Sequence, residues 1–303
     1  MALFAINAGQ NPTQDLRRHA ASLPKSQPLI VMIHGYRFSP RHPRSNPHGH
    51  ILSLSPDMVG PRVLSWPAAL GFGQNGGNGL GIAFGWEARG SLRGAYRRAG
   101  QAGRDLARLM ADLSEQADKP VAIIGHSMGA RVALSALHHA APGVAGRLIL
   151  LAGAEFREPA LAAIDSPAGQ QAEVINITTR ENDLFDLGLE LCLSLGRRRA
   201  LGFGLAQARA NWLDIQIDSP QVIAALDRLG FPVGGDAKRL CHWSPYLRGG
   251  LFDFYRAALH HPQVLPLRGL RAGLSHQPMP RWSRLLAPGG AAQMTGRALE
   301  GPA

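Results

Sequence analysis

The sequence predicts an α/β fold with a mostly parallel central sheet flanked by helices, and three observations support this prediction. Short apolar runs alternate along the chain with stretches of helical periodicity, as expected for βα units. These runs are apolar at consecutive positions, which is typical of strands that are covered on both faces. One of the runs also leads through a glycine-flanked serine directly into a helical pattern.

The elements follow from these patterns in chain order. The expected strands are 28–33, 62–66, 121–124, 147–152, 173–179 and 213–217. The clearest helix is expected over 94–117, where Leu106, Leu109 and Leu113 recur at three- and four-residue spacings with charged residues between them. Further helices are expected over 130–138 and 247–259.

The charge and cysteine content of the chain argue against several classes of protein. The chain has 303 residues and a net charge of +11, and nearly all of its positive charge comes from arginine. Because these arginines are dispersed and no nucleic-acid-binding module is present, we interpret them as solvated surface and expect no nucleic-acid partner. Cys192 and Cys241 are the two cysteines, so a disulfide framework is excluded, and no cysteine and histidine spacing predicts a metal site.

The chain divides into a short lead-in over 1–27, a catalytic-type domain over 28–261 and a basic, proline-rich tail over 262–303 that we expect to be flexible. The glycine-rich stretch 71–90 is expected to be a loop, and the stretch 184–210 a cap over the site or a connecting helix. We see neither a signal peptide nor a membrane span, and we expect a cytoplasmic location.

The stretch Gly125-His126-Ser127-Met128-Gly129 lies between a buried strand and a helix, the context in which G-x-S-x-G forms a nucleophile elbow. On this sharp turn the hydroxyl of Ser127 is exposed above the carboxyl end of the sheet. The alternative is a βα turn whose serine only caps the helix.

Two backbone amides are candidates for an oxyanion hole, the hydrogen-bond donors that stabilise a developing negative oxygen. Met128 N–H follows the serine, and Tyr36 N–H lies in the turn that ends the 28–33 strand. Four residues around these turns are expected to contribute to substrate binding. They are His34, Gly35, His126 and Trp66.

A serine needs a base within hydrogen-bond reach and a group that orients the base. Where a nucleophile elbow is present, the acid and then the histidine follow the serine along the chain. His242, on a segment that leads into the last helix, is therefore the expected base. Asp183, after the 173–179 strand, is the first candidate for the acid. Asp186 and then Glu155 are the alternatives.

Together these motifs resemble the α/β-hydrolase superfamily over roughly residues 28–260. The turn Ile33-His34-Gly35-Tyr36, the segment Ser65-Trp66-Pro67 and the GHSMG elbow also resemble a group of bacterial serine hydrolases of undefined substrate, often called DUF900-like. The resemblance implies attack by Ser127 on an ester-type carbonyl, an acyl-enzyme, and hydrolysis by water activated through His242.

The leading hypothesis is a cofactor-free serine hydrolase of the carboxylesterase or lipase type, acting on a small-molecule ester or acyl substrate. An acyltransferase or thioesterase would use the same residues. A non-catalytic α/β-hydrolase module that binds a partner is the second class of function. The sequence predicts neither the substrate's acyl length nor the oligomeric state.

Overall fold

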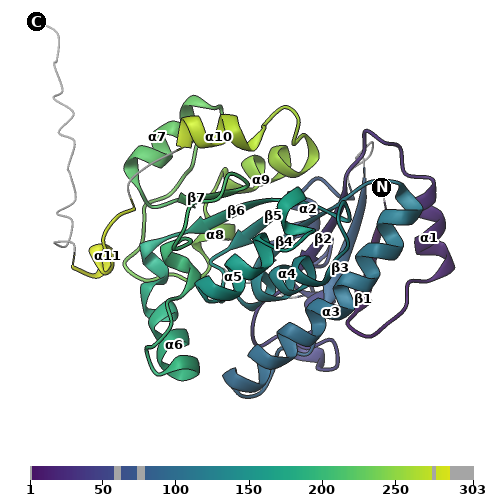
Figure 1. The fold of residues 1–303 in the computed structure, drawn as a ribbon, viewed down its shortest axis with the longest axis horizontal. Coiled ribbons are helices and arrows are strands. Elements are labelled where there is room, and N and C mark those ends of the chain that lie inside the picture. The colour runs from purple at the N-terminus through teal and green to yellow at the C-terminus, as the bar shows by residue number, and fades with distance from the viewer. Residues whose placement is uncertain (1, 58–62, 74–78, 275–277, 287–303) are drawn as a thin grey trace, which may run out of the picture.

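A computed structural model describes the chain except for residues 1, 58–62, 74–78, 275–277 and 287–303 (Figure 1). Within the described part, seven strands form a single sheet in the order β1-β3-β2-β4-β5-β6-β7, and every neighbouring pair is parallel. The strands are β1 (Ala2–Asn7), β2 (Leu29–Ile33), β3 (Leu80–Gly85), β4 (Val121–His126), β5 (Ala145–Leu151), β6 (Glu173–Thr178) and β7 (Trp212–Gln216). The predicted fold class is confirmed.

Helices cover both faces of the sheet, which explains why the strands are apolar throughout (Figure 1). One face carries α1 (Gln14–Ala21), α3 (Leu92–Ala117), α4 (Met128–His139) and α5 (Arg157–Ile164). The other carries α2 (Trp66–Ala69), α7 (Pro220–Arg228), α8 (Ser244–Leu247), α9 (Leu251–His260) and α10 (Leu267–Leu274). Among the described residues no helix is both long and apolar enough to cross a membrane.

The strand order places a crevice between β2 and β4. These two strands are neighbours in the sheet, but the chain leaves β2 toward β3 on one side and leaves β4 toward β5 on the other. In open parallel sheets, ligands bind outside the carboxyl ends of the strands where such connections diverge. The turns after β2 and β4 are those that hold Gly35, Tyr36, Ser127 and Met128.

The N-terminal part of the sheet differs from the prediction. The expected lead-in contains β1, and the expected glycine-rich loop contains the buried strand β3. The glycines of β3 are required by packing: a Cβ at Gly81 would lie 3.1 Å from the ring of Phe72, and one at Gly85 would lie 2.2 Å from Asn7 Oδ1. Part of the expected loop, residues 74–78, lies outside the described residues.

The expected strand over 62–66 is wrong. The described part of this segment is irregular, and the helix α2 begins at Trp66. Ser65 caps this helix by accepting a hydrogen bond from Ala68 N–H, and Pro67 occupies its first turn. A serine cap followed by proline is a helix start. This signal outweighs the β propensity of the preceding residues.

The stretch 184–210 contains α6 (Asp183–Ser194) and a short 3₁₀ turn, Leu201–Phe203. The described part of the C-terminal tail includes α10, which packs on α7 and β7, and α11 (Ser283–Leu286). Residues 278–286, which we call the strap, bind side chains beside α6 and β7. This part of the tail, which the sequence leads us to expect to be flexible, thus makes specific contacts with the domain. Residues 287–303 lie outside the description.

Candidate active site

Ser127 lies on a strained turn between β4 and α4. Its φ of 55° and ψ of −121° fall in a region that residues other than glycine rarely adopt. The turn also brings backbone segments so close that side chains cannot fit between them. A Cβ at Gly125 would lie 2.8 Å from Gly129 O, and one at Gly129 would lie 2.5 Å from Ile33 O. Both glycines of the motif are therefore required by the geometry of the elbow.

Two other non-glycine residues with positive φ lie around the same cavity as Ser127. They are Arg37, with φ of 74°, and Ala152, with φ of 43°. Backbone strain of this kind persists only where the surrounding structure enforces it, and it gathers at functional sites. The clustering marks this cavity independently of the sequence motif.

The turn after β2 is fixed to the loop after β3. Trp86 N–H donates to His34 Nε2 at 3.0 Å, and His34 Nδ1–H donates to Gly35 O at 2.9 Å. Arg37 N–H donates to Ala88 O at 3.0 Å, and the Tyr36 hydroxyl donates to Gly90 O at 2.5 Å. These bonds hold the Tyr36 amide beside the elbow, where a Cβ on Gly35 would lie 2.9 Å from Ser127 Cβ.

Met128 is the first residue of α4, and the first N–H groups of a helix have no partner within the helix. Its amide therefore follows Ser127 at a helix terminus whose dipole favours negative charge. Met128 and Tyr36 both line the cavity with Ser127. The structure brings the two predicted oxyanion donors to the same site.

His242 also lines this cavity. Its Nδ1 lies 2.6 Å from Asn182 Oδ1, the residue before the predicted acid. An amide oxygen accepts, so this bond corresponds to the tautomer that carries its proton on Nδ1 and leaves Nε2 free to act as a base. The imidazole is enclosed by the ring of Phe185, with centroids 4.7 Å apart, and by that of His126, 4.6 Å away.

Among the described residues, none of the three predicted acids has a recorded hydrogen bond to His242, although Asp186 lines the same cavity. Asp183 forms an ion pair with Arg180 and accepts from Trp282 N–H at 2.7 Å. Glu155 binds the Tyr96 hydroxyl and the Arg131 guanidinium. Asp186 accepts from Asn182 Nδ2 at 3.0 Å and so reaches His242 only through that amide. Asp183 begins α6, one residue past Asn182, and successive helical side chains point in different directions.

The segment that carries His242 is anchored from two sides. Glu181 accepts from Lys238 N–H at 2.9 Å and from the Ser244 hydroxyl, and Cys241 N–H donates to Glu181 O at 3.0 Å. His126 Nε2 lies 3.0 Å from His242 O. Glu181 and Asn182 were missed by sequence reasoning. The available signal was the polar run 180–183 directly after β6.

Burial keeps both histidines of this site neutral. It lowers the pKa of His242 well below the usual value, and the neighbouring His126 lowers it further. It also lowers the pKa of His126 to about 4, against a smaller opposing effect of the hydrogen bond to His242 O. A neutral imidazole with a free Nε2 is the form that a general base requires.

The residues predicted to bind substrate divide into two groups. Gly35 and His126 line the cavity. His34 is fully buried, its pKa is lowered to about 3 by burial, and both its ring nitrogens are engaged by backbone groups. Trp66 is also fully buried and packs on Tyr246 and Phe252 in the core. Both side chains are therefore packed in the protein interior and do not line the cavity.

The cavity has a volume of about 450 Å³ and an apolar wall. The wall is formed by Phe38, Leu92, Leu184, Phe185, Leu189, Cys192 and Trp243. Leu184 and Phe185 on α6 remain 42% and 39% exposed, so the wall continues to the surface. An aliphatic or aromatic group next to a reacting carbonyl would bury its surface here.

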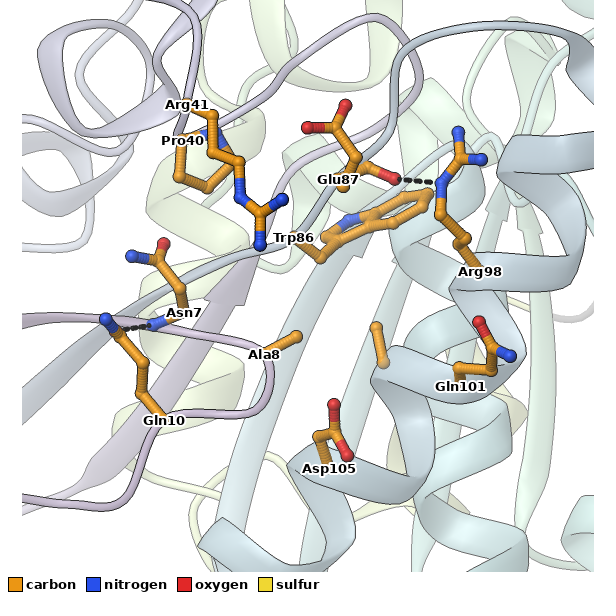
Figure 2. A pocket seen from close by; sticks show the side chains of 11 residues that line it. Asn7, Ala8, Gln10, Pro40, Arg41, Trp86, Glu87, Arg98, Gln101 and Asp105 are labelled. Atoms are coloured by element: carbon orange, nitrogen blue, oxygen red, sulfur yellow. Dashed lines mark hydrogen bonds between the residues drawn. The ribbon is translucent and has the colours of Figure 1, made fainter.

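A second cavity, of about 360 Å³, lies beyond the carboxyl ends of β1 and β3 (Figure 2). Its described lining contains polar and charged side chains but no serine, cysteine or histidine. Several of these side chains bind nearby groups: Arg98 Nε donates to Glu87 O at 2.9 Å, and Gln10 Oε1 accepts from Asn7 N–H at 2.7 Å. The described lining of this second cavity therefore lacks a nucleophilic side chain with a neighbouring base.

Comparison with known proteins gives one family match. Residues 70–175 match the family described as serine aminopeptidase, S33 (Hydrolase_4). A search of curated proteins finds no significant match. The match covers about a third of the chain, and together with the fold it supports the α/β-hydrolase superfamily, the class of hydrolase that the elbow indicates.

Among solved structures, the chain is similar to the lipase BlEst2 of Bacillus licheniformis. The propeptide form is 14% identical with a TM-score of 0.42, over 85% of this chain and 53% of that one. The chain thus spans about half the length of that form. The mature form is 12% identical with a TM-score of 0.41, over 82% and 96% of the two chains. The carboxylesterase CesB (YbfK) of Bacillus subtilis is 11% identical with a TM-score of 0.29, over 82% and 85%.

Proposed function

We propose that the chain is a serine hydrolase that cleaves esters with an apolar acyl group. Ser127 Oγ attacks the ester carbonyl while His242 Nε2 takes the hydroxyl proton. The developing oxyanion binds Met128 N–H and Tyr36 N–H. His242 then returns the proton to the leaving alcohol, and an acyl group remains on Ser127. Water, deprotonated by His242, releases the acid and regenerates the serine.

One observation carries this proposal. A serine held at positive φ, beside two candidate oxyanion donors, shares an apolar cavity with a neutral histidine whose Nδ1 is already engaged. A strained serine conformation costs about 1–3 kcal/mol, and a merely structural serine offers no compensation for that cost. This arrangement supports the roles of Ser127 as nucleophile and His242 as its base.

The proposal differs from the expected triad in its third member. Asn182, an amide, takes the place of the acid and orients His242 through Nδ1. It supplies no negative charge to stabilise the imidazolium that forms during proton transfer. Asn182 is therefore a positioning residue in the proposed mechanism, which keeps the base in the useful tautomer.

The substrate class is tested with p-nitrophenyl esters of two to twelve acyl carbons, assayed beside alanine p-nitroanilide as the aminopeptidase substrate. We expect saturable ester hydrolysis, with Ser127→Ala reducing kcat by about a thousandfold or more. Anilide hydrolysis above that of the esters would favour the activity in the matched family's name. Ester turnover that survives Ser127→Ala in folded protein would contradict the proposal.

A further inference from the structure

We propose that Asp186 is the residue that fixes the active orientation of the site, by holding the Asn182 amide with its oxygen toward His242. This inference rests on the proposed function and adds a positioning residue to it. Asp186 does not touch the imidazole. It acts through Asn182, which forms the only recorded link between Asp186 and His242 in the described residues.

The three side chains form a hydrogen-bonded series in which Asn182 and Asp186 are buried and His242 is partly exposed. Asn182 and Asp186 are 3% and 2% exposed. His242 Nδ1–H donates to Asn182 Oδ1 over 2.6 Å, and Asn182 Nδ2–H donates to Asp186 Oδ1 over 3.0 Å. Each donor meets an acceptor in this orientation of the amide.

The opposite orientation would disable the base. The two ends of an amide have the same shape, so hydrogen-bond partners decide which end faces which neighbour. With its amino group toward His242, Asn182 would donate to Nδ1. The imidazole proton would then move to Nε2, and a protonated Nε2 cannot accept the proton of Ser127. The Asp186 oxygen prevents this because it accepts from the amino end.

Asp186 is itself rigidly placed. A Cβ at Gly202 would lie 2.1 Å from Asp186 Oδ2, so the glycine backbone packs directly against the carboxyl group. Arg180 holds that backbone by donating to Gly202 O, and its guanidinium lies over the ring of Phe203, 4.5 Å from the centroid. Gly202 has no side chain that could displace Asp186.

The charged groups around Asp186 are Arg180, Asp183 and Glu190. Burial is the main influence and raises the pKa of Asp186 to about 8, which Arg180 opposes and the two carboxylates reinforce. The carboxyl group is therefore largely protonated at neutral pH. When the proton is on Oδ2, which has no hydrogen-bond partner among the described residues, Oδ1 still accepts from Asn182. The ionised group has no donor at all, so its bias on the amide orientation is strongest above about pH 8.

The test exchanges the two side chains. Asp186→Asn offers either amide end to Asn182 and removes the bias, so we expect fluorophosphonate labelling of Ser127 to slow about tenfold or more. The double variant N182D/D186N restores one acceptor–donor pair: the new carboxylate accepts from His242 Nδ1–H and from the new amide. We expect its labelling rate to return to within about threefold of wild type.

A pH profile gives a readout that a merely structural role would not change. The new carboxylate at position 182 favours the imidazolium, so the acid limb of labelling in the double variant should move to higher pH than in wild type. Glu155→Gln is the matched control, since Glu155 is a buried carboxylate that binds Tyr96 and Arg131 and has no recorded bond to Asn182, Asp186 or His242. We expect it to label at the wild-type rate.

The outcomes separate this inference from the proposed function. Wild-type protein that never labels at Ser127 would overturn the proposed function. Labelling at Ser127 that is as fast in folded Asp186→Asn as in wild type, or a double variant as slow as the single one, would overturn the inference alone. If Asp186→Asn does not fold, ¹⁵N chemical shifts of His242 in wild type decide: we expect the Nδ1–H tautomer, and the Nε2–H tautomer would contradict the proposal.

Discussion

At the scale of single residues, the surrounding structure restricts the backbone conformation of Ser127 and the hydrogen bonding of the nearby histidines. Ser127 cannot relax to an ordinary conformation because Gly125 and Gly129 close the turn around it. His34 cannot serve as a second base, because backbone groups engage both its nitrogens and burial lowers its pKa to about 3. His242 is the histidine with Nδ1 oriented and a cavity in front of it.

The protonation state of His242 leads to a prediction about the pH dependence of kcat/KM. Burial lowers the pKa of His242, and His126 lowers it further, so the imidazole stays neutral below its ordinary value of 6.5. Activity requires the neutral form. We therefore expect the midpoint of the acid limb, the pH at which kcat/KM has dropped to half its maximum, to lie below pH 6.5. The profile is measured with a short p-nitrophenyl ester at constant ionic strength. An acid limb above pH 7 would mean that a negative charge stabilises the imidazolium.

The sequence predicts the serine and the histidine of the site because each follows from a motif or from chain order. It does not predict Asn182 in the third position. That choice depends on how the turn Arg180–Asn182 enters α6, which decides whether residue 182 or 183 faces the imidazole. A carboxylate is the usual partner, and Asp183 carries one. Local backbone geometry outweighs this preference.

At the scale of elements, α6 is the helix that forms much of the apolar wall of the cavity. Its residues Leu184, Phe185, Gly188, Leu189 and Cys192 line the cavity. The sequence left open whether 184–210 was a cap or a connection, and the helix forms a wall of the cavity that contains Ser127. Gly188 gives this wall an open position, since a Cβ there would meet no atom within 4 Å.

We therefore predict that Gly188→Leu shortens the preferred acyl chain. The new side chain fits without a clash and occupies cavity volume, so kcat/KM for an octanoyl ester relative to an acetyl ester should fall about tenfold or more. Gly273→Leu is the matched control, because Gly273 lies in the exposed part of α10, where a Cβ would meet Leu229 at 3.9 Å. An unchanged ester ratio in Gly188→Leu would show that acyl chains bind elsewhere.

The strap is the second element with a specific role. Arg284 Nε donates to Asp218 Oδ2 at 3.0 Å, and Arg281 donates to Glu190 Oε2 at 2.9 Å. Asp218 and Glu190 are both almost fully buried. The sequence could not indicate these pairs, because Arg284 is separated from Asp218 by 66 positions and its neighbours show no periodic pattern.

Arg284→Ala should lower the free energy of unfolding by about 3 kcal/mol, since it leaves the buried carboxylate of Asp218 without its ion pair. The exposed pair of Arg256 and Asp253 provides a control, and Arg256→Ala should change stability by less than about 1 kcal/mol. Urea denaturation measures both variants. Equal, small effects would mean that the strap is not bound as described.

At the scale of the whole molecule, the site follows from the strand order. The connections from β2 and β4 run in opposite directions, and the crevice between them receives the oxyanion turn and the nucleophile elbow. The βα alternation that predicts this sheet was visible in the sequence. The strands β1 and β3 were not recognised. The apolar run of β1 is short and is followed by a long polar stretch, and the glycines of β3 are typical of loops when packing is unknown.

The central claim is that Ser127 is a nucleophile activated by His242. The most direct measurement is labelling with a fluorophosphonate, followed by peptide mass spectrometry, in wild type, Ser127→Ala and His242→Ala. We predict a single label on the peptide that contains Ser127, no label in Ser127→Ala, and labelling at least about a hundredfold slower in His242→Ala. A label on another residue, or folded wild-type protein that takes no label, would contradict the claim.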